Sequence, residues 1–370
     1  MKKNMLTLAA LAACVSFTAC SNEDEISVPQ TSSLDKVYVG IETMANTRSG
    51  ITATAFSGTE SIGVFLHGGS GIDDATNGVY NTTSNSNIKD PLNIEYKHDV
   101  TGNFWAAASN PIILSDKVGV LYAYYPYAAW TSTTESPNGK VIPVNVPTAQ
   151  GTGQSDGTKD ETGACPDYMW ATPVTNVSNA TAQVKFTMNH ALSMVTFKFK
   201  RDTYPGEGKI TSISLTNADG KSVIKYGKST MHIGTGALDK TQATAGAISL
   251  TPSTTTTLVD ATDAATLPRM LVYPTDANFE STDAVFKIVM DGKTYTMPVP
   301  HQLATSSSGY KFEAGKNYVY TFTLTGVGFG GTVDNGGDGN GDGKSDIDVQ
   351  ITAWDEVTFD NAGSIATPDK

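Results

Sequence analysis

Short runs of apolar or alternating residues, separated by Gly, Pro, Asn and Asp, recur along almost the whole chain and restrict its fold more than any other feature. Such runs predict strands bounded by turns, because alternate side chains of a strand point to opposite faces of a sheet. The clearest runs span residues 37–41, 62–66, 118–125, 210–215 and 318–324. No long amphipathic helix pattern is present, and only 17% of the residues are charged. The pattern therefore predicts an all-β protein, most simply antiparallel strands packed as β-sandwiches.

Two segments indicate how these strands follow one another. Residues 284–299 contain Asp291-Gly292 between two strand-like runs, which predicts a hairpin because a two-residue turn requires positive φ. Within residues 184–199 the apolar residues change parity near Ser193, which a continuous flat strand cannot do. Either a bulge lies there, or the chain passes from one sheet to another at a domain junction.

The first twenty residues indicate export. Lys2 and Lys3 precede an apolar run over residues 5–19, which is too short to span a bilayer comfortably and has the layout of a secretory signal peptide. Small residues lead to Cys20, and this order resembles the lipobox of bacterial lipoproteins, in which the cysteine is acylated. Two or three acyl chains would anchor the protein stably in the outer membrane. The alternative is an ordinary signal peptide followed by a coincidental cysteine.

The segment behind Cys20 is polar and has little to pack, so it is interpreted as a tether. The stretch SNEDE at residues 21–25 contains an acidic cluster and resembles the signal that sends Bacteroidota lipoproteins to the cell surface. Cys14 would leave with the signal peptide and Cys20 would carry lipid, so Cys165 has no partner within the chain. The sequence therefore excludes a disulfide framework and a CxxC metal or redox site.

The length of 370 residues suggests two domains, at roughly 100–200 residues each. We place their boundary close to His190, which is interpreted as a hydrogen-bonded histidine at the junction rather than a ligand. The predicted organisation is a signal peptide at 1–19, a lipidated tether at 20–35, an N-terminal β-sandwich at 36–190 and a C-terminal β-sandwich at 191–370, which includes a Gly- and Asp-rich loop at 326–346 and a final strand at 347–359.

Charge and motif content exclude several functions. The formal net charge of −12 disfavours nucleic-acid binding, because phosphate neutralisation needs an excess of Lys and Arg. The histidines occur without an HExxH motif, and neither a G-x-S-x-G elbow nor a Walker loop is present. No catalytic pair is assigned, and the sequence predicts a protein that is not an enzyme.

Several local patterns together resemble the Bacteroidales fimbrillins, the subunits of protease-assembled type V pili. The matching stretches are YAYYPY at 122–127, DYMWA at 167–171, FTMNHALS at 186–193, GKNY at 315–318 and ITAW at 351–354. Their order covers nearly the whole mature chain. The resemblance implies two tandem transthyretin-like β-sandwiches, export as a surface lipoprotein, and assembly into a fimbria by strand exchange with other fimbrial subunits.

Family subunits are held inactive by an N-terminal strand that an arginine-specific protease removes, and this chain has a matching segment. Arg48 is the only arginine before Arg201, and it is followed by Ser49 in a small, polar context that suits a protease-accessible loop. The alternation over residues 37–41 fits a removable strand with one buried face. Cleavage after Arg48 would release residues 20–48 with the lipid. The alternative is an ordinary loop arginine.

The last apolar run predicts a strand with a single apolar face. The residues that share its parity include Ile347, Val349, Ile351, Val357 and Phe359. Such a strand could return to its own sheet, or it could complete a groove in a neighbouring subunit through main-chain hydrogen bonds and side-chain pockets. The resemblance favours its use as the donor strand.

The loop at 326–346 contains a partial calcium-binding pattern. Its D-x-N-x-D-G-x-x-D spacing places Asp338, Asn340, Asp342 and Asp346 at the first, third, fifth and ninth positions of an EF-hand-type loop. Position twelve is Val349, so the bidentate acid is missing. The alternative is a flexible tether for the final strand, and the two roles can coexist. No other cofactor is predicted.

A second function remains open: a monomeric glycan-binding lipoprotein of the outer-membrane surface. In this interpretation Trp105, Trp130, Trp170 and the tyrosines at 122–127 would stack on sugar rings. It predicts an exposed aromatic platform, no required cut at Arg48 and a C-terminal strand paired within its own domain. A host or bacterial surface receptor is compatible with both functions.

Overall fold

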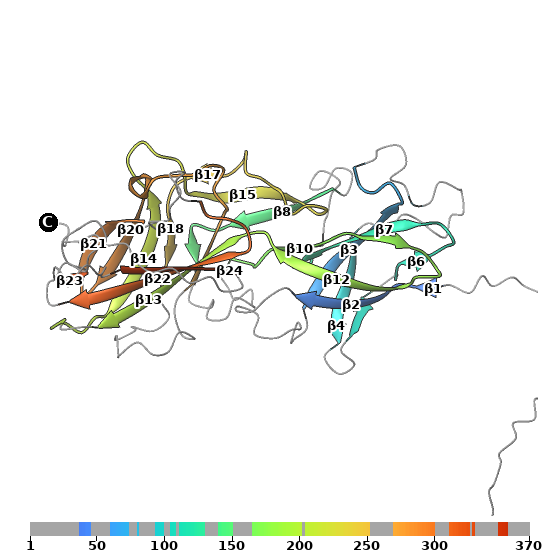
Figure 1. The fold of residues 1–370 in the computed structure, drawn as a ribbon, viewed down its shortest axis with the longest axis horizontal. Helices are drawn as coiled ribbons and strands as arrows, with labels where there is room; N and C mark the ends of the chain where they lie inside the picture. Colours follow the sequence, from blue (N-terminus) through green and yellow to red (C-terminus); the bar gives the residue numbers. More distant parts are fainter. Residues whose placement is uncertain are drawn as a thin grey trace, which may run out of the picture. The chain divides into compact units, whose positions relative to one another are not determined.

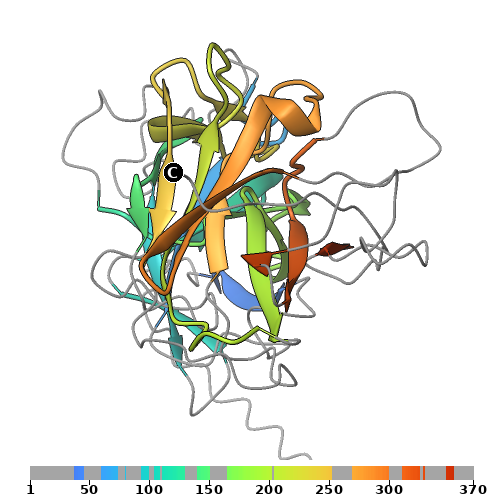
Figure 2. The same ribbon diagram turned by 90° about the vertical axis from the view of Figure 1, so that its left-hand side faces the viewer.

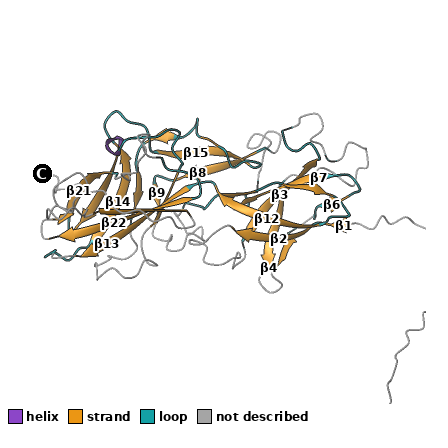
Figure 3. Cartoon of the chain, viewed as in Figure 1, coloured by secondary structure: helices purple, strands orange, loops and turns teal. Residues whose placement is uncertain are grey.

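The computed structural model describes residues 37–45, 60–73, 80, 93–99, 104–108, 111–129, 140–150, 165–201, 204–251, 269–299, 311–325, 328–329 and 347–353. Residues 37–370 form one unit by their contacts, separate from residues 1–36. In the described ranges strands dominate, and the helical element is a single 3-10 turn, η3 (Ser281–Asp283) (Figure 3). These ranges contain no helix long and apolar enough to cross a membrane. The predicted all-β fold is confirmed.

Most strands of the first half form one eight-stranded sheet (Figure 1). Across the sheet the order is β10 (Met169–Ala171), β12 (Gln183–His190), β2 (Gly40–Ala45), β5 (Phe104–Ala107), β4 (Ile94–Asp99), β3 (Ser61–Gly68), β7 (Gly119–Tyr125) and β11 (Val174–Val177). β10 also pairs with β7, so the sheet closes on itself. A separate two-stranded pair joins β1 (Val37–Tyr38) to β6 (Ile113–Leu114).

The later strands form three further sheets, which Figure 2 shows from a second side. The first contains β19 (Arg269–Val272), β13 (Ser193–Arg201), β22 (Lys316–Thr325) and β23 (Gly328–Phe329), with β24 (Ile347–Ala353) also paired to β22. The second contains β21 (Lys293–Pro298), β20 (Ala284–Met290), β14 (Ile210–Asn217), β18 (Ile248–Leu250) and β9 (Ala149–Gln150). The third joins β15 (Lys225–His232) to β16 (Leu238–Asp239), β17 (Thr244–Ala245) and β8 (Val141–Val146).

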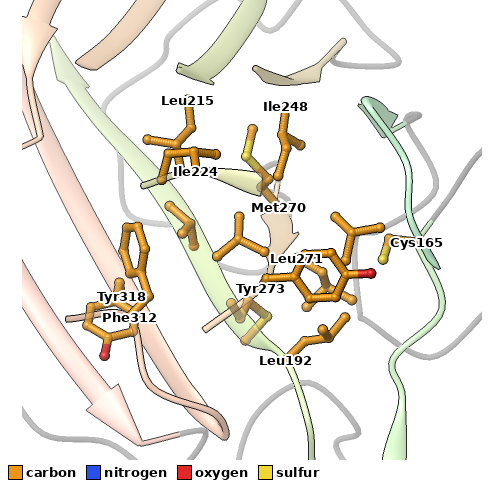
Figure 4. Packing of buried hydrophobic residues seen from close by; sticks show 14 of the residues in the cluster. Cys165, Leu192, Leu215, Ile224, Ile248, Met270, Leu271, Tyr273, Phe312 and Tyr318 are labelled. Atoms are coloured by element: carbon orange, nitrogen blue, oxygen red, sulfur yellow. The ribbon is translucent and has the colours of Figure 1, made fainter. Parts of the chain in front are cut away.

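Two apolar clusters form the core, and β7 contributes to both. Leu121 and Ala123 belong to the cluster enclosed by the closed sheet, whereas Tyr122 and Tyr124 belong to the larger cluster that the later sheets share. This division follows from the alternation of side chains along a strand. Figure 4 shows part of the larger cluster, with Met270 and Leu271 of β19 among its residues.

The parity change near Ser193 marks a passage between sheets. β12 ends at His190 in the closed sheet, and β13 begins at Ser193 in another sheet. The chain therefore passes from one sheet to another here, as the second sequence interpretation predicted, while a domain junction at this point stays a prediction. The predicted hairpin is also present, because Asp291 and Gly292 have φ values of 49° and 74° between β20 and β21.

The segment at 140–150 precedes residue 190 but pairs with strands that come after it in the chain. β8 lies antiparallel to β15, and β9 lies parallel to β18. The buried Gln150 side chain donates a hydrogen bond to the Leu271 carbonyl oxygen (2.6 Å) and accepts one from the Leu271 N–H (2.9 Å). These residues are thus part of the later sheets, whereas the two-domain division at residue 190 stays a prediction.

Candidate functional site

The N-terminal strand β2 fills a slot in the closed sheet. On one side it runs parallel to β12, in a register that extends from Gly40 opposite Gln183 to Ala45 opposite Met188. On its other side it is antiparallel to β5, with Ile41 opposite Trp105. A strand between two partners uses both of its hydrogen-bonding edges, so β2 is a central strand of this sheet although it is the first long one in sequence.

Burial holds the same segment in place. Val39 is 6% exposed and Ile41 is 2% exposed, and both belong to the cluster enclosed by the closed sheet. The Val39 N–H donates a hydrogen bond of 3.2 Å to the Ile112 carbonyl oxygen. Burying two aliphatic side chains of this size stabilises the fold by about 1.5–3 kcal/mol each.

One buried tyrosine forms a hydrogen bond to the residue that pairs with Val39. The Tyr96 hydroxyl oxygen accepts a hydrogen bond of 3.2 Å from the N–H of Ile112. The carbonyl oxygen of the same residue accepts the hydrogen bond from the Val39 N–H. Burial raises the pKa of Tyr96 to about 12, and the Ile112 N–H lowers it in part. The phenol is therefore neutral at physiological pH and packs as an apolar ring with one satisfied oxygen.

Loss of β2 would expose a specific apolar surface. The edges of β12 and β5 would lose their shared neighbour and present unpaired N–H and C=O groups, which is the usual template for adding a strand. Trp105, which is 4% exposed, would lose Ile41 as its neighbour across the pair. On its other side Trp105 keeps His98, whose ring centroid lies 5.2 Å from that of the indole.

The C-terminal strand β24 lies antiparallel on one edge of β22. The positions Ile347, Val349 and Ile351 lie directly opposite Phe322, Tyr320 and Tyr318, respectively. Those three residues of β22 are fully buried. Because directly opposed residues of an antiparallel pair share a face, the apolar parity of the final strand is in register with the buried parity of β22.

The remaining predicted site residues lie outside the described ranges. They are Cys20, Arg48, Ser49, Asp338, Asn340, Asp342, Asp346, Val357 and Phe359. Among the residues that are described, no group of three or more His, Cys, Asp and Glu side chains could hold a metal ion. The calcium pattern thus stays a prediction.

The aromatic platform of the glycan-binding interpretation is wrong for three of its residues, whereas Tyr125 and Tyr127 are partly exposed. Trp105, Tyr122 and Tyr124 are buried, because their positions on β5 and β7 face the two apolar clusters. Sequence reasoning offered Trp105 as a sugar contact and missed its place opposite Ile41. Trp130 lies outside the described ranges, and Trp170 is partly exposed.

A buried hydrogen bond between two side chains lies at the junction between β12 and β13. His190 Nδ1 lies 2.9 Å from Asp167 Oδ1, and each side chain is only 2% exposed. The prediction of a hydrogen-bonded junction histidine is therefore right. Sequence reasoning missed Asp167 as its partner, although this residue begins the DYMWA stretch that carries part of the family resemblance.

The comparisons with known proteins agree with this architecture. The chain belongs to the fimbrillin-like family, whose sequence profile matches residues 43–354. No curated protein matches the sequence significantly.

Two crystal structures have a similar fold. A candidate cell adhesion protein from Bacteroides uniformis has a TM-score of 0.54 and 18% identity, over 86% of this chain and 99% of that one. A second, from Bacteroides ovatus, has a TM-score of 0.51 and 19% identity, over 79% of this chain and 94% of that one.

Proposed function

We propose that this protein is a structural or adhesive subunit of a cell-surface fimbria, and that subunits join by exchange of β2 for a strand of a neighbour. The observation that carries this proposal is the position of β2 between β12 and β5, with Val39 and Ile41 buried. Because β2 precedes both β5 and β12 in the chain, its removal leaves the connection between these two strands intact. Membership of the fimbrillin-like family supports the same function.

Arg48 is a candidate cleavage point at the position that this mechanism needs. Arg48 follows the last residue of β2, Ala45, by only three positions. An arginine-specific protease that cuts between Arg48 and Ser49 would disconnect the strand from the rest of the sheet. In this proposal Cys20 carries the lipid that holds the precursor at the outer-membrane surface, and cleavage also releases the subunit from that anchor.

The replacement strand would bind more strongly than the one it displaces. In the segment that would be removed, one parity carries Val39, Ile41, Thr43 and Ala45, of which only Val39 and Ile41 are large aliphatic residues. The final strand offers Ile347, Val349 and Ile351 at equivalent spacing, followed by Val357 and Phe359. Each additional aliphatic side chain that becomes buried in the slot contributes about 1.5–3 kcal/mol, so the final strand would be held there more strongly than β2.

A strand that is donated to a neighbour must first leave its own sheet. β24 lies at the edge of its sheet and is paired on one side, to β22, so it has fewer main-chain hydrogen bonds to lose than a central strand. Two residues of the predicted loop at 326–346 form β23 against β22, so the Gly- and Asp-rich residues after β23 would act as the tether, since Gly-rich chains behave as flexible coils. Calcium on Asp338, Asn340, Asp342 and Asp346 would stiffen that tether and limit its reach.

One observation favours the alternative of a monomeric glycan-binding surface lipoprotein. That function requires the final strand to remain in its own sheet, and β24 does pair with β22 of the same chain. The two functions differ in the outcome of cleavage, because only a fimbrial subunit would polymerise.

Limited digestion tests the proposal. Purified residues 21–370 are treated with an arginine-specific protease, and the products are followed by N-terminal sequencing and on unboiled gels. We expect a new N-terminus at Ser49 and a ladder of stable oligomers. Arg48→Ala should abolish both, and a chain that ends at residue 346 should be cut but remain monomeric. Cleavage at Ser49 that leaves the full-length chain strictly monomeric would contradict strand exchange.

A further inference from the structure

A cleft of about 700 Å³ lies apart from the β2 slot. Four separate segments line it: β10 with the end of β12, the turn before β16, the residues after β19 and the residues before β22. Small-molecule sites in proteins commonly occupy roughly 300–1,000 Å³, so the cleft is large enough for a ligand of two or more rings.

Trp170 enters this cleft because of its parity on β10. Met169 and Ala171 are buried in the cluster of the closed sheet, so the residue between them points to the opposite face. Its indole is partly exposed and packs against the larger apolar cluster. The opposing residue on β12, Asn189, also lines the cleft.

The turn beside Trp170 is fitted closely to the indole. Gly236 has a φ of 69°, and a side chain at this position would begin 2.0 Å from the indole Nε1 atom. The Gly236 N–H donates a hydrogen bond of 2.8 Å to the His232 carbonyl oxygen, which fixes the turn. Glycine is therefore required both by the backbone conformation and by the close approach.

The opposite wall is held by an ion-pair network. Lys240 donates a hydrogen bond from its Nζ atom to the Pro274 carbonyl oxygen and lies 2.6 Å from Asp276 Oδ1. Asp276 Oδ2 lies 2.7 Å from Lys225 Nζ. Hydrogen bonds from Lys225 and Lys240 lower the pKa of Asp276, so its carboxylate is ionised at neutral pH.

The chemistry of the lining favours an uncharged, polyhydroxylated ligand. The charges of Lys240 and Lys311 are balanced by those of Asp276 and Glu313, so neither an anion nor a cation is favoured overall. The carboxylates, the ammonium groups and the Asn189 amide line the same cleft as the Trp170 indole and bring hydrogen-bonding atoms to it. Ring C–H groups can pack on that indole while ring hydroxyls bond to the polar rim.

We propose that this cleft is a binding site for a neutral saccharide, with Trp170 as the packing surface. The site does not depend on strand exchange, because the residues that form it belong to the unprocessed chain and none of them belongs to β2. It would give a fimbrial subunit a sugar-directed adhesive function.

Titration of the unprocessed protein with neutral oligosaccharides tests the site. A panel of gluco-, galacto- and manno-configured disaccharides and trisaccharides is measured by isothermal calorimetry and by saturation-transfer NMR. We expect saturable binding of at least one sugar, weakened tenfold or more by Trp170→Ala and threefold or more by Lys311→Ala with Glu313→Gln. Lys228→Ala, an exposed change on β15 outside the cleft, is the matched control.

The rim variant keeps the proposal testable if Trp170→Ala does not fold, because Lys311 and Glu313 are both exposed. No binding of any panel member up to about 10 mM would overturn the proposal. Binding that both cleft variants leave unchanged, or binding restricted to charged sugars or peptides, would also overturn it. Polymerisation after cleavage at Arg48 is scored separately, so failure of either proposal leaves the other intact.

Discussion

Ile41 of β2 lies directly opposite Trp105 of β5, and both side chains are almost completely buried. The pair joins the segment that would be removed during processing to a strand that would stay. It therefore offers a direct way to separate the stability of the precursor from that of the processed protein.

Ile41→Ala should destabilise the unprocessed protein by about 2–5 kcal/mol, because it leaves a cavity beneath the closed sheet. Ile41→Val should cost about 0.5–1.5 kcal/mol. Chemical denaturation followed by tryptophan fluorescence measures both. After cleavage at Arg48 and assembly, neither change should alter stability, since the residue has left with its strand. An equal effect before and after processing would argue against the removal of β2.

Gln150→Ala should destabilise the protein by about 1–3 kcal/mol. The change removes both hydrogen bonds to the Leu271 backbone and leaves buried polar groups unpaired. Gln183→Ala on β12 serves as the control, because that side chain is exposed and should change stability by no more than about 0.5 kcal/mol. If the two variants melt alike, residues 140–150 do not contribute to the later sheets as described.

The Asp167–His190 pair should show strong energetic coupling. Asp167→Ala removes the carboxylate that lies 2.9 Å from a buried imidazole, and leaving a buried polar group without its partner typically costs about 1–3 kcal/mol. His190→Ala and the double variant complete a double-mutant cycle, measured by urea denaturation. We expect a coupling energy of about 0.5–3 kcal/mol, whereas additive single effects would show that the two side chains act independently.

Alkaline pH should destabilise the protein partly through Tyr96. Its folded-state pKa is raised to about 12, above the usual tyrosine value of 10.0, so the neutral phenol is favoured by folding. This stabilisation is fully present below pH 10 and is lost as the pH rises from about 10 to 12. Burial raises the pKa of Tyr124, Tyr273 and Tyr318 in the same direction.

The measurement is the unfolding free energy of the wild type and of Tyr96→Phe between about pH 8 and pH 12. The variant cannot ionise at this position, so its stability should fall less steeply, by up to about 1.4 kcal/mol per pH unit. Parallel curves would show that Tyr96 does not titrate differently in the folded and unfolded states.

Local patterns were sufficient to predict much of the fold. Apolar runs identified β3, β7 and β22, which are buried on both faces, and alternation identified β14, whose buried residues recur mainly at every second position. Asp291-Gly292 predicted the hairpin, because few residue pairs accept positive φ. The parity change near Ser193 similarly marked the passage between sheets.

Apart from the hairpin of β20 and β21, the partners of the strands were decided only in three dimensions. Nothing near residues 141–150 in the sequence indicates pairing with β15 and β18, and nothing near Met169 indicates that β10 closes the sheet against β7. The sequence offered Trp105 as a surface contact for sugars, but its position on β5 places it in the core. Apolar runs and alternation are properties of a single strand, so the sequence by itself determined where many of the longer strands form. Pairing depends on how apolar faces from distant segments bury one another, and that is a property of the whole tertiary structure.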